Sequence, residues 1–121
     1  MPRLSNQEIK RLAYQAVIKF EQNNGRTAEV VEKDGYDIRS CGRGGERHIE
    51  VKGSISEKPT HIGIEASEFE EMQNNNKWFL YIVRNVGKTS TTHVFSKDDV
   101  LRHLSGIHYE FIIRFRLADF Q

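Results

Sequence analysis

The sequence predicts an α/β domain in which a single mixed sheet packs against helices. Three observations support this prediction. An amphipathic helix opens the chain, three short strands with tight turns follow it, and a second helix leads into a strand that is apolar at every position. A strand, a helix and a further buried strand in that order predict a right-handed parallel crossover.

The first element is a helix from Ser5 to about Asn24. Its apolar residues recur at intervals of three and four, the spacing of one helical face: Ile9, Leu12, Ala13, Ala16, Val17 and Phe20. Ser5 and Glu8 have the spacing of a capping box at the start of this helix. Gly25 can adopt the left-handed conformation that ends it.

A three-stranded meander follows, with strands predicted at 27–33, 36–41 and 47–53. The pair Asp34-Gly35 predicts a tight hairpin between the first two strands, and the glycine-rich segment 42–46 predicts the second turn. The side chains of a strand alternate between its faces, so Glu50 and Lys52 share one face while Val51 enters the core. By the same alternation, Asp37 points away from the packed side of its own strand.

The rest of the chain supplies the second half of the sheet. We expect a loop at 54–63 with a short extended end, and a helix at 68–76 opened by a Ser67–Glu70 capping box. The remaining predicted elements are a strand at 78–83 buried on both faces, a strand at 92–96, a short helix at 97–104 and a last strand at 109–117. In that last strand one face is apolar: Tyr109, Phe111, Ile113, Phe115 and Leu117.

Length and composition limit the classes of protein that fit. A chain of 121 residues is expected to form one domain over residues 1–121. With 18 basic and 17 acidic residues, its net charge of +1 argues neither for a protein that coats nucleic acid nor for an acidic solvating tail. The single Cys41 favours a reducing compartment, and neither a signal peptide nor a membrane-spanning run is recognisable. We therefore expect a soluble cytoplasmic protein without a membrane partner.

The acidic and basic side chains of the meander form the candidate site. If Asp37 pairs with the strand that carries Glu50 and Lys52, two carboxylates and an ammonium lie close together. Two carboxylates about 4 Å apart repel by roughly 4 kcal/mol, and a cation relieves that repulsion. Oxygen ligands of this kind favour Mg²⁺ or Mn²⁺. The competing interpretation is an ordinary cross-strand salt bridge at the surface.

Other residues are weaker candidates for the same site. Glu21 follows Ala13 and Val17 at intervals of four, so it either reaches over the sheet toward the cluster or faces solvent at the helix boundary. Basic side chains near the meander either contact the phosphates of nucleic acid or are ordinary solvent-exposed charges on a glycine-rich hairpin. The candidate nucleic-acid contacts are four basic residues and one histidine: Arg39, Arg43, Arg47, His48 and Lys58.

Four segments in this order, "GYDIRS", "RHIEVKGS", "IGIEASEFEEM" and "WFLYIVRNV", resemble the NO VEIN C-terminal-like domains. Within them, Asp37 and the triplet Glu50-Val51-Lys52 resemble the PD-(D/E)XK pattern of restriction-endonuclease-like nucleases. The resemblance runs from about Glu21 to Val86. One residue departs from the superfamily pattern, because Tyr36 stands where its name has proline.

The resemblance implies a restriction-endonuclease-like αβββαβ core with a metal site. In that site Asp37, Glu50 and the carbonyl of Val51 would hold Mg²⁺ or Mn²⁺, Lys52 would be catalytic, and Glu21 would be an accessory acid. The expected activity is metal-dependent hydrolysis of phosphodiester bonds in nucleic acid, in DNA rather than RNA. Domains of this group also occur within larger proteins, so a fusion partner is a further expectation.

Two hypotheses of other classes stay open at this stage. The first is a catalytically silent module that keeps the fold and binds nucleic acid or a partner protein. The second is a homodimer in which the strand "FIIRFRL", residues 111–117, pairs as an exposed sheet edge.

Overall fold

The computed structural model of the chain describes residues 3–33, 35–59, 61–107, 111–114 and 117–120. Its elements, in chain order, are α1 (Asn6–Asn23), β1 (Thr27–Lys33), β2 (Tyr36–Gly42), β3 (Gly45–Gly53), β4 (His61–Ile64), α2 (Ala66–Asn74), β5 (Trp78–Arg84), β6 (Thr91–Ser96), α3 (Lys97–His103), β7 (Leu104–Ile107), β8 (Phe111–Arg114) and the 3₁₀ helix η1 (Leu117–Phe120). Within these described ranges, no helix combines the length and the apolar character needed to cross a membrane.

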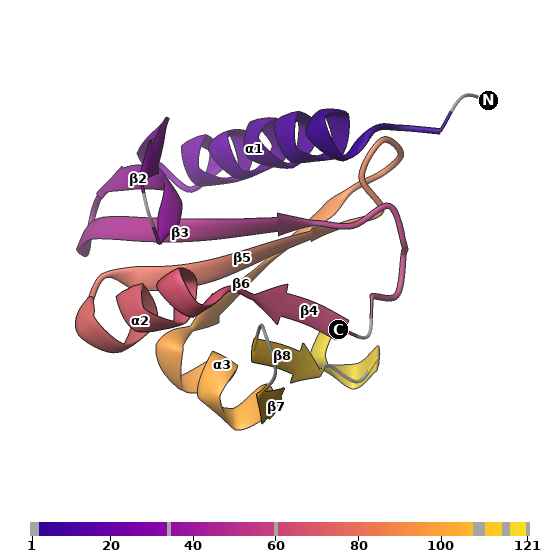
Figure 1. The fold of residues 1–121 in the computed structure, drawn as a ribbon. Coiled ribbons are helices and arrows are strands. Elements are labelled where there is room, and N and C mark those ends of the chain that lie inside the picture. Colours follow the sequence, from indigo (N-terminus) through magenta and orange to yellow (C-terminus); the bar gives the residue numbers. More distant parts are fainter. Residues whose placement is uncertain (1–2, 34, 60, 108–110, 115–116, 121) are drawn as a thin grey trace.

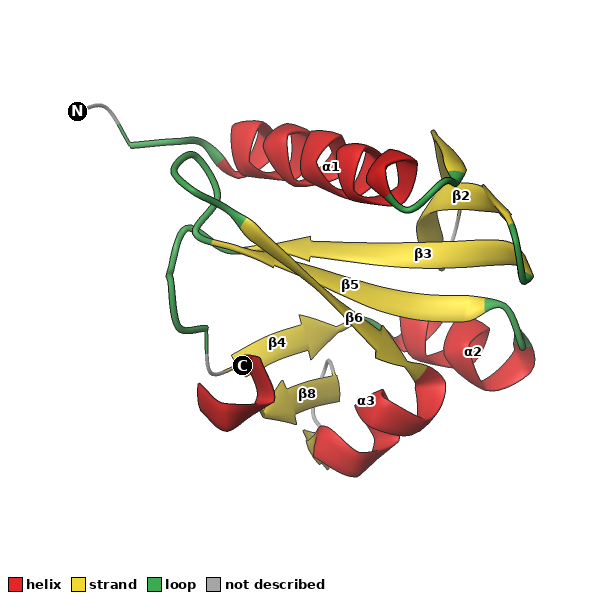
Figure 2. Ribbon diagram, turned by 180° about the vertical axis from the view of Figure 1, so that it is seen from behind, coloured by secondary structure: helices red, strands yellow, loops and turns green. Residues whose placement is uncertain are grey.

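The main sheet has five strands in the order β1-β2-β3-β5-β6. The strands β3 and β5 are parallel, and the other neighbouring pairs are antiparallel. Figures 1 and 2 show α1 lying along one face of this sheet and α2 and α3 on the other. The predicted meander and the parallel connection from β3 through α2 to β5 are therefore confirmed. Asp34 of the first hairpin lies outside the described residues.

The prediction of a single sheet is wrong, because β4, β8 and β7 form a second, three-stranded sheet. The segment expected to be only the extended end of a loop pairs antiparallel with residues 111–114. Strand β8 has a neighbour on both sides, so residues 111–114 are not the exposed edge that the dimer hypothesis required. Tyr109 and Phe115 of the predicted last strand lie outside the described residues.

Two apolar clusters lie on opposite faces of the main sheet. On one face of the sheet, the apolar side of α1 packs on Ile38, Ile49 and Val51. On the other face, residues of α2, α3 and β4 pack on Trp78, Leu80 and Ile82 of β5. Strand β5 contributes to both clusters, which explains why it is apolar from 78 to 83.

The helix ends are fixed by side-chain caps. At the start of α1, Glu8 N–H donates to Ser5 Oγ at 3.1 Å, and Ser5 N–H donates to Glu8 Oε1 at 3.0 Å, as predicted. The left-handed Gly25, with φ of 77°, follows the helix as expected. The start predicted for α2 is wrong, because the helix begins at Ala66 and its capping box joins Glu65 to a glutamate three residues later.

A close approach between α1 and β3 positions the first half of the helix. A Cβ atom added at Gly53 would lie 2.9 Å from the Cβ of Ala13 and 3.2 Å from the Cγ2 of Ile9. The 2.9 Å contact is shorter than real Cβ contacts and the 3.2 Å contact is unusually tight, so the end of β3 favours glycine where α1 passes over it. Residues in the first turns of α1 consequently lie beside the outgoing end of β3.

Candidate active site

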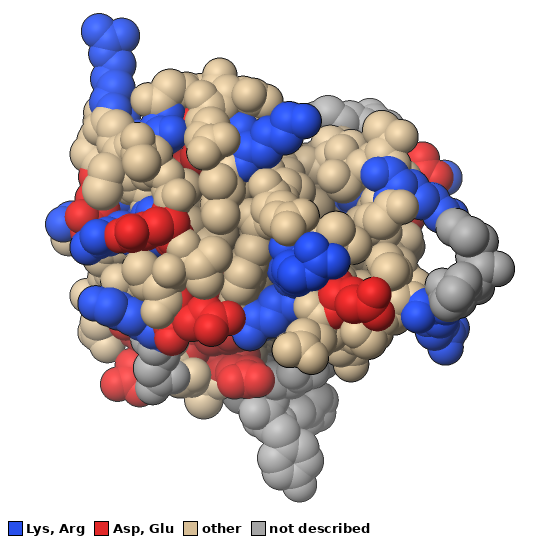
Figure 3. Space-filling view, turned by 90° about the horizontal axis from the view of Figure 1, so that it is seen from above, with Lys and Arg blue, Asp and Glu red and all other residues tan. Residues whose placement is uncertain are grey.

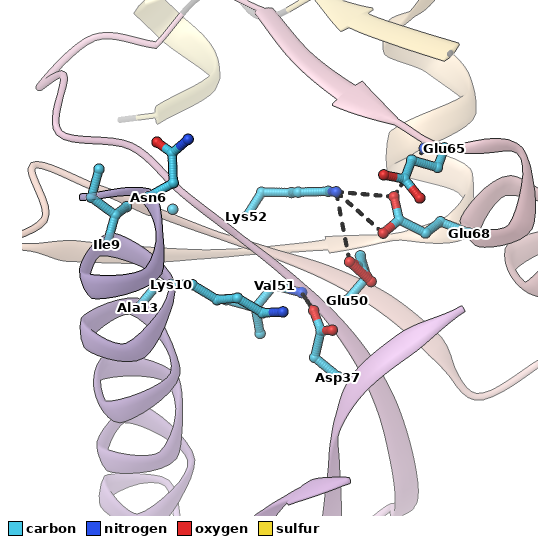
Figure 4. A pocket seen from close by; sticks show the side chains of 11 residues that line it. Asn6, Ile9, Lys10, Ala13, Asp37, Glu50, Val51, Lys52, Glu65 and Glu68 are labelled. Carbon is cyan, nitrogen blue, oxygen red and sulfur yellow. Dashed lines mark hydrogen bonds and ion pairs between the residues drawn. The ribbon is translucent and has the colours of Figure 1, made fainter. Parts of the chain in front are cut away.

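Asp37 is placed at the point where β2 and β3 separate. The paired register of the two strands ends at Ile38 opposite Ile49. Beyond this pair, the Asp37 side chain reaches β3, and Val51 N–H donates to Asp37 Oδ2 at 2.9 Å. The carboxylate is thereby fixed against the strand that carries Glu50 (Figure 4).

Glu50 and Lys52 lie side by side on β3, as the alternation of strand side chains predicts. Lys52 Nζ is 3.7 Å from Glu50 Oε1, and the exposed fractions of their side chains are 24% and 4%. Val51 between them packs into the apolar cluster under α1. The two carboxylates and the amine lie together, as the sequence predicts. Glu50 and Lys52 are less exposed than the partners of an ordinary surface salt bridge.

A third carboxylate, that of Glu68 in the first turn of α2, belongs to the same group. Lys52 Nζ donates to Glu68 Oε1 at 2.9 Å and to Glu68 Oε2 at 3.2 Å. The Oε1 atom also accepts the backbone N–H of Glu65 at 2.9 Å, so the helix cap fixes this carboxylate. Sequence reasoning missed Glu68 because it placed the capping box two residues too late, at Ser67 and Glu70.

The group opens into a cleft of about 580 Å³ between the first half of α1, the outgoing end of β3 and the start of α2. Asp37, Glu50, Lys52 and Glu68 line one side, and Lys10 lies on the α1 side (Figure 4). The cleft is therefore acidic at its base, with basic side chains provided by β3 and α1.

Burial and neighbouring charges shift the pKa values of the group. Burial, a hydrogen bond with Glu68 and the nearby charge of Asp37 raise the pKa of Glu50 to about 11. Burial alone would lower the pKa of Lys52, but the charges of Glu50 and Glu68 outweigh it and raise that pKa. Burial likewise opposes a low pKa for Glu68, yet its hydrogen bond with Glu50 and the charge of Lys52 lower it. These pKa shifts keep both the Glu50 carboxyl and the Lys52 amine protonated at neutral pH.

The donor set fits a hard divalent cation. Asp37 and Glu50 offer carboxylate oxygens on one side of the cleft, and Val51 lines the same space. In the described part of the chain no three His, Cys, Asp or Glu side chains surround one point. A pair of carboxylates is nevertheless a usual protein contribution to Mg²⁺, which keeps several water ligands. A cation at this pair would replace the proton that burial and the neighbouring carboxylates keep on Glu50.

The Tyr14 hydroxyl is a buried polar group beside this pair. It makes no hydrogen bond of ordinary geometry within the described structure. Burial and the adjacent Asp37 charge raise the pKa of Tyr14, so the phenol stays protonated. This hydroxyl is a donor that faces Asp37 from α1, and the sequence pattern did not select it.

Glu21 is not brought to the cleft. Its side chain is 1% exposed and forms an ion pair with Arg26, with 3.2 Å between Glu21 Oε1 and Arg26 Nε. Arg26 also donates to Ser40 Oγ and to the carbonyl oxygens of residues 43 and 45, so the pair fastens the glycine-rich turn. Glu21 lies eleven residues beyond Lys10 on α1, which is about 16 Å along a helix axis.

Two of the five residues expected to contact nucleic acid are held by other side chains. Arg39 forms an ion pair with Glu29 on β1. Arg47 donates to the Tyr81 hydroxyl at 2.8 Å and lies over the ring of Phe79. Neither arginine is among the described residues that line the cleft.

The other three expected contacts also lie away from the cleft lining. His48 contacts the side chains of Glu46 and Asn75. Arg43 and Lys58 are exposed, in the glycine-rich turn and in the loop before β4 respectively. On the face that carries α1, Lys and Arg side chains are scattered among acidic ones (Figure 3).

A comparison with protein families identifies the group to which these features belong. The profile described as "Protein NO VEIN, C-terminal" matches residues 9–95. The chain belongs to this family. The matched segment contains Asp37, Glu50, Lys52 and Glu68, so the resemblance inferred from the sequence is confirmed over the whole candidate site. No curated protein matches the chain.

Among solved structures, the fold is similar to that of Hjc from Archaeoglobus fulgidus, a Holliday junction resolvase from an archaeal hyperthermophile. The TM-score is 0.61 at 16% sequence identity, and the match covers 93% of this chain and 86% of that one. At this identity the similarity concerns the fold. The mixed five-stranded sheet with its helices is the restriction-endonuclease-like α/β architecture that the family resemblance implies.

Proposed function

We propose that this chain is a metal-dependent nuclease that hydrolyses phosphodiester bonds, with DNA as the expected substrate. The observation that carries the proposal is the convergence of Asp37, Glu50 and Lys52 on one cleft. The restriction-endonuclease-like fold supports it as an analogy, since one solved structure with a similar fold is a Holliday junction resolvase.

Asp37 and Glu50, with the carbonyl of Val51, would hold Mg²⁺ or Mn²⁺. When bound, such an ion lowers the pKa of its water ligand and neutralises charge on the scissile phosphate. Asp37 is suited to a fixed ligand position because Val51 N–H already orients its carboxylate. Glu50 becomes a ligand by releasing the proton that its buried surroundings otherwise retain.

Lys52 acts in this proposal as a fixed positive charge. Its raised pKa keeps the ammonium protonated at neutral pH, which makes it unsuitable as a general base. Its position 3.7 Å from Glu50 places the charge beside the metal ligands, where it can stabilise the negative charge that develops on the phosphate. Its partial burial strengthens that interaction relative to one in water.

Lys10 is the basic side chain of α1 that is best placed to contact the substrate backbone. It lines the cleft, its side chain is 56% exposed, and its Nζ atom lies 3.7 Å from Glu32 Oε1. Arg43 and Lys58 are proposed as more distant phosphate contacts because both are exposed. Arg39, Arg47 and His48 would first have to leave the partners described above.

Nuclease assays test the proposal directly. Plasmid, single-stranded DNA, four-way DNA junctions and RNA would each be incubated with Mg²⁺ or Mn²⁺. Cleavage by the wild-type protein should stop with EDTA and fall about 100-fold or more in Lys52→Ala and Asp37→Ala. Lys88→Ala, which changes an exposed lysine outside the cleft, is the matched control and should cut normally.

Two outcomes would overturn the assignment. Absence of cleavage on all four substrates, or equal cleavage by both variants and the wild type, contradicts a nuclease that uses this site. Nucleic-acid binding that survives both EDTA and Lys52→Ala, without cleavage, would instead indicate the catalytically silent module.

A further inference from the structure

Glu68 lines the cleft and contacts Lys52, but neither the sequence pattern nor the proposed reaction uses it. Its side chain is 13% exposed and makes two contacts with Lys52 Nζ, at 2.9 and 3.2 Å. The capping hydrogen bond from Glu65 N–H fixes the same carboxylate at the start of α2. The capped start of α2 therefore presents a partly buried negative charge to Lys52 of β3, which lines the cleft.

The distances around Lys52 show what this charge does. The ammonium lies between Glu68 Oε1, at 2.9 Å, and Glu50 Oε1, at 3.7 Å. The shorter pair is the hydrogen-bonded one. With Glu68 uncharged, Glu50 would become the strongest partner for Lys52, and a direct ion pair between them would neutralise a carboxylate that the proposed cation needs.

We propose that Glu68 is a positioning residue, which holds the ammonium of Lys52 on the α2 side of the cleft and so leaves Glu50 available to a divalent cation. This inference rests on the proposed metal site but extends it to a residue outside the two-carboxylate pattern. Glu68 acts here through Lys52, and it is not a ligand itself.

A double-mutant cycle with Mn²⁺ binding as the readout tests the inference. Affinity would be measured by titration calorimetry in wild type, Glu68→Gln, Lys52→Met and the double variant. Glutamine can still accept the capping hydrogen bond from Glu65, so Glu68→Gln removes the charge but keeps the helix start. Glu70→Gln, an exposed change of the same charge in the same helix, is the control.

Glu68→Gln should weaken Mn²⁺ binding about tenfold in the presence of Lys52. In the Lys52→Met background the same change should weaken it no more than about threefold, because no ammonium remains to move onto Glu50. Glu70→Gln should bind as the wild type does. In cleavage assays, Glu68→Gln should lower kcat with little change in KM, since Glu68 acts through Lys52 and is not proposed to contact the substrate.

The outcomes separate this inference from the proposed function. Wild-type affinity in Glu68→Gln, or an equal loss with and without Lys52, refutes positioning through Lys52. The expected cycle without any cleavage supports the positioning role and contradicts the nuclease. A wild-type protein that binds no Mn²⁺ refutes the metal site, and both claims fall with it.

Discussion

Replacing Glu50 by glutamine is expected to stabilise the metal-free protein, by an amount that grows with pH. The folded structure raises the pKa of Glu50 from its ordinary value of 4.5 to about 11. Between these values the folded chain keeps a proton that the unfolded chain releases. Because the folded state then binds more protons, raising the pH lowers the free energy of unfolding.

The magnitude follows from the pH interval. Each pH unit in which only the unfolded chain is ionised lowers stability by about 1.4 kcal/mol. The interval from 4.5 to 7 therefore corresponds to about 3 kcal/mol, because the folded pKa lies above 7. Glutamine does not ionise in either state, and its amide can donate to Glu68 as the protonated carboxyl does. Glu50→Gln should match the wild type near pH 4 and exceed it by about 3 kcal/mol at pH 7.

Urea unfolding in EDTA at several pH values from about 4 to 7 would measure this difference. Trp78, which is 2% exposed, gives a fluorescence signal for loss of the core. Glu70→Gln controls for the change in net charge because Glu70 is exposed. A difference that does not change with pH, or a less stable Glu50→Gln at pH 7, would show that Glu50 is ionised in the folded protein and would refute the reasoning.

Three further changes test other parts of the structure. Arg26→Ala leaves Glu21 buried without its ion-pair partner, so urea unfolding should show a loss of about 3–5 kcal/mol; an unchanged midpoint would contradict this role. Lys10→Ala should reduce the salt dependence of nucleic-acid binding by about one unit of log–log slope in fluorescence anisotropy, whereas Lys19→Ala, on the opposite side of α1, should not; equal slopes would exclude a phosphate contact. Gly53→Ala adds a Cβ 2.9 Å from a methyl group of α1 and should lower stability by about 1–3 kcal/mol; thermal unfolding at the wild-type temperature would show that the helix can move away.

The central elements of the fold and part of the site follow from local sequence patterns. The helical spacing and the Ser5 cap define α1, and the uninterrupted apolar run predicts a strand covered on both faces. Strand alternation is equally local, so it places Glu50 and Lys52 together and Val51 opposite them. These features depend on neighbours within a few residues, which is why the sequence alone predicts them.

Other features depend on how elements meet in space. Residues 61–64 become a strand because they pair with residues 111–114, about fifty positions away, and that pairing has no local signature. Similarly, Glu68 contacts Lys52 because α2 begins at Ala66, which places Glu68 in the first turn of the helix.

For Glu21, the sequence determined only that the residue lies at the edge of the apolar face of α1. The tertiary structure decided its partner, because α1 crosses the sheet with its first half over the cleft and its last turn over the glycine-rich hairpin. A carboxylate buried there needs a counter-charge within reach, and Arg26 provides it. Periodicity specifies which face of a helix is buried, whereas the position of each residue along the sheet is fixed only when the helix docks.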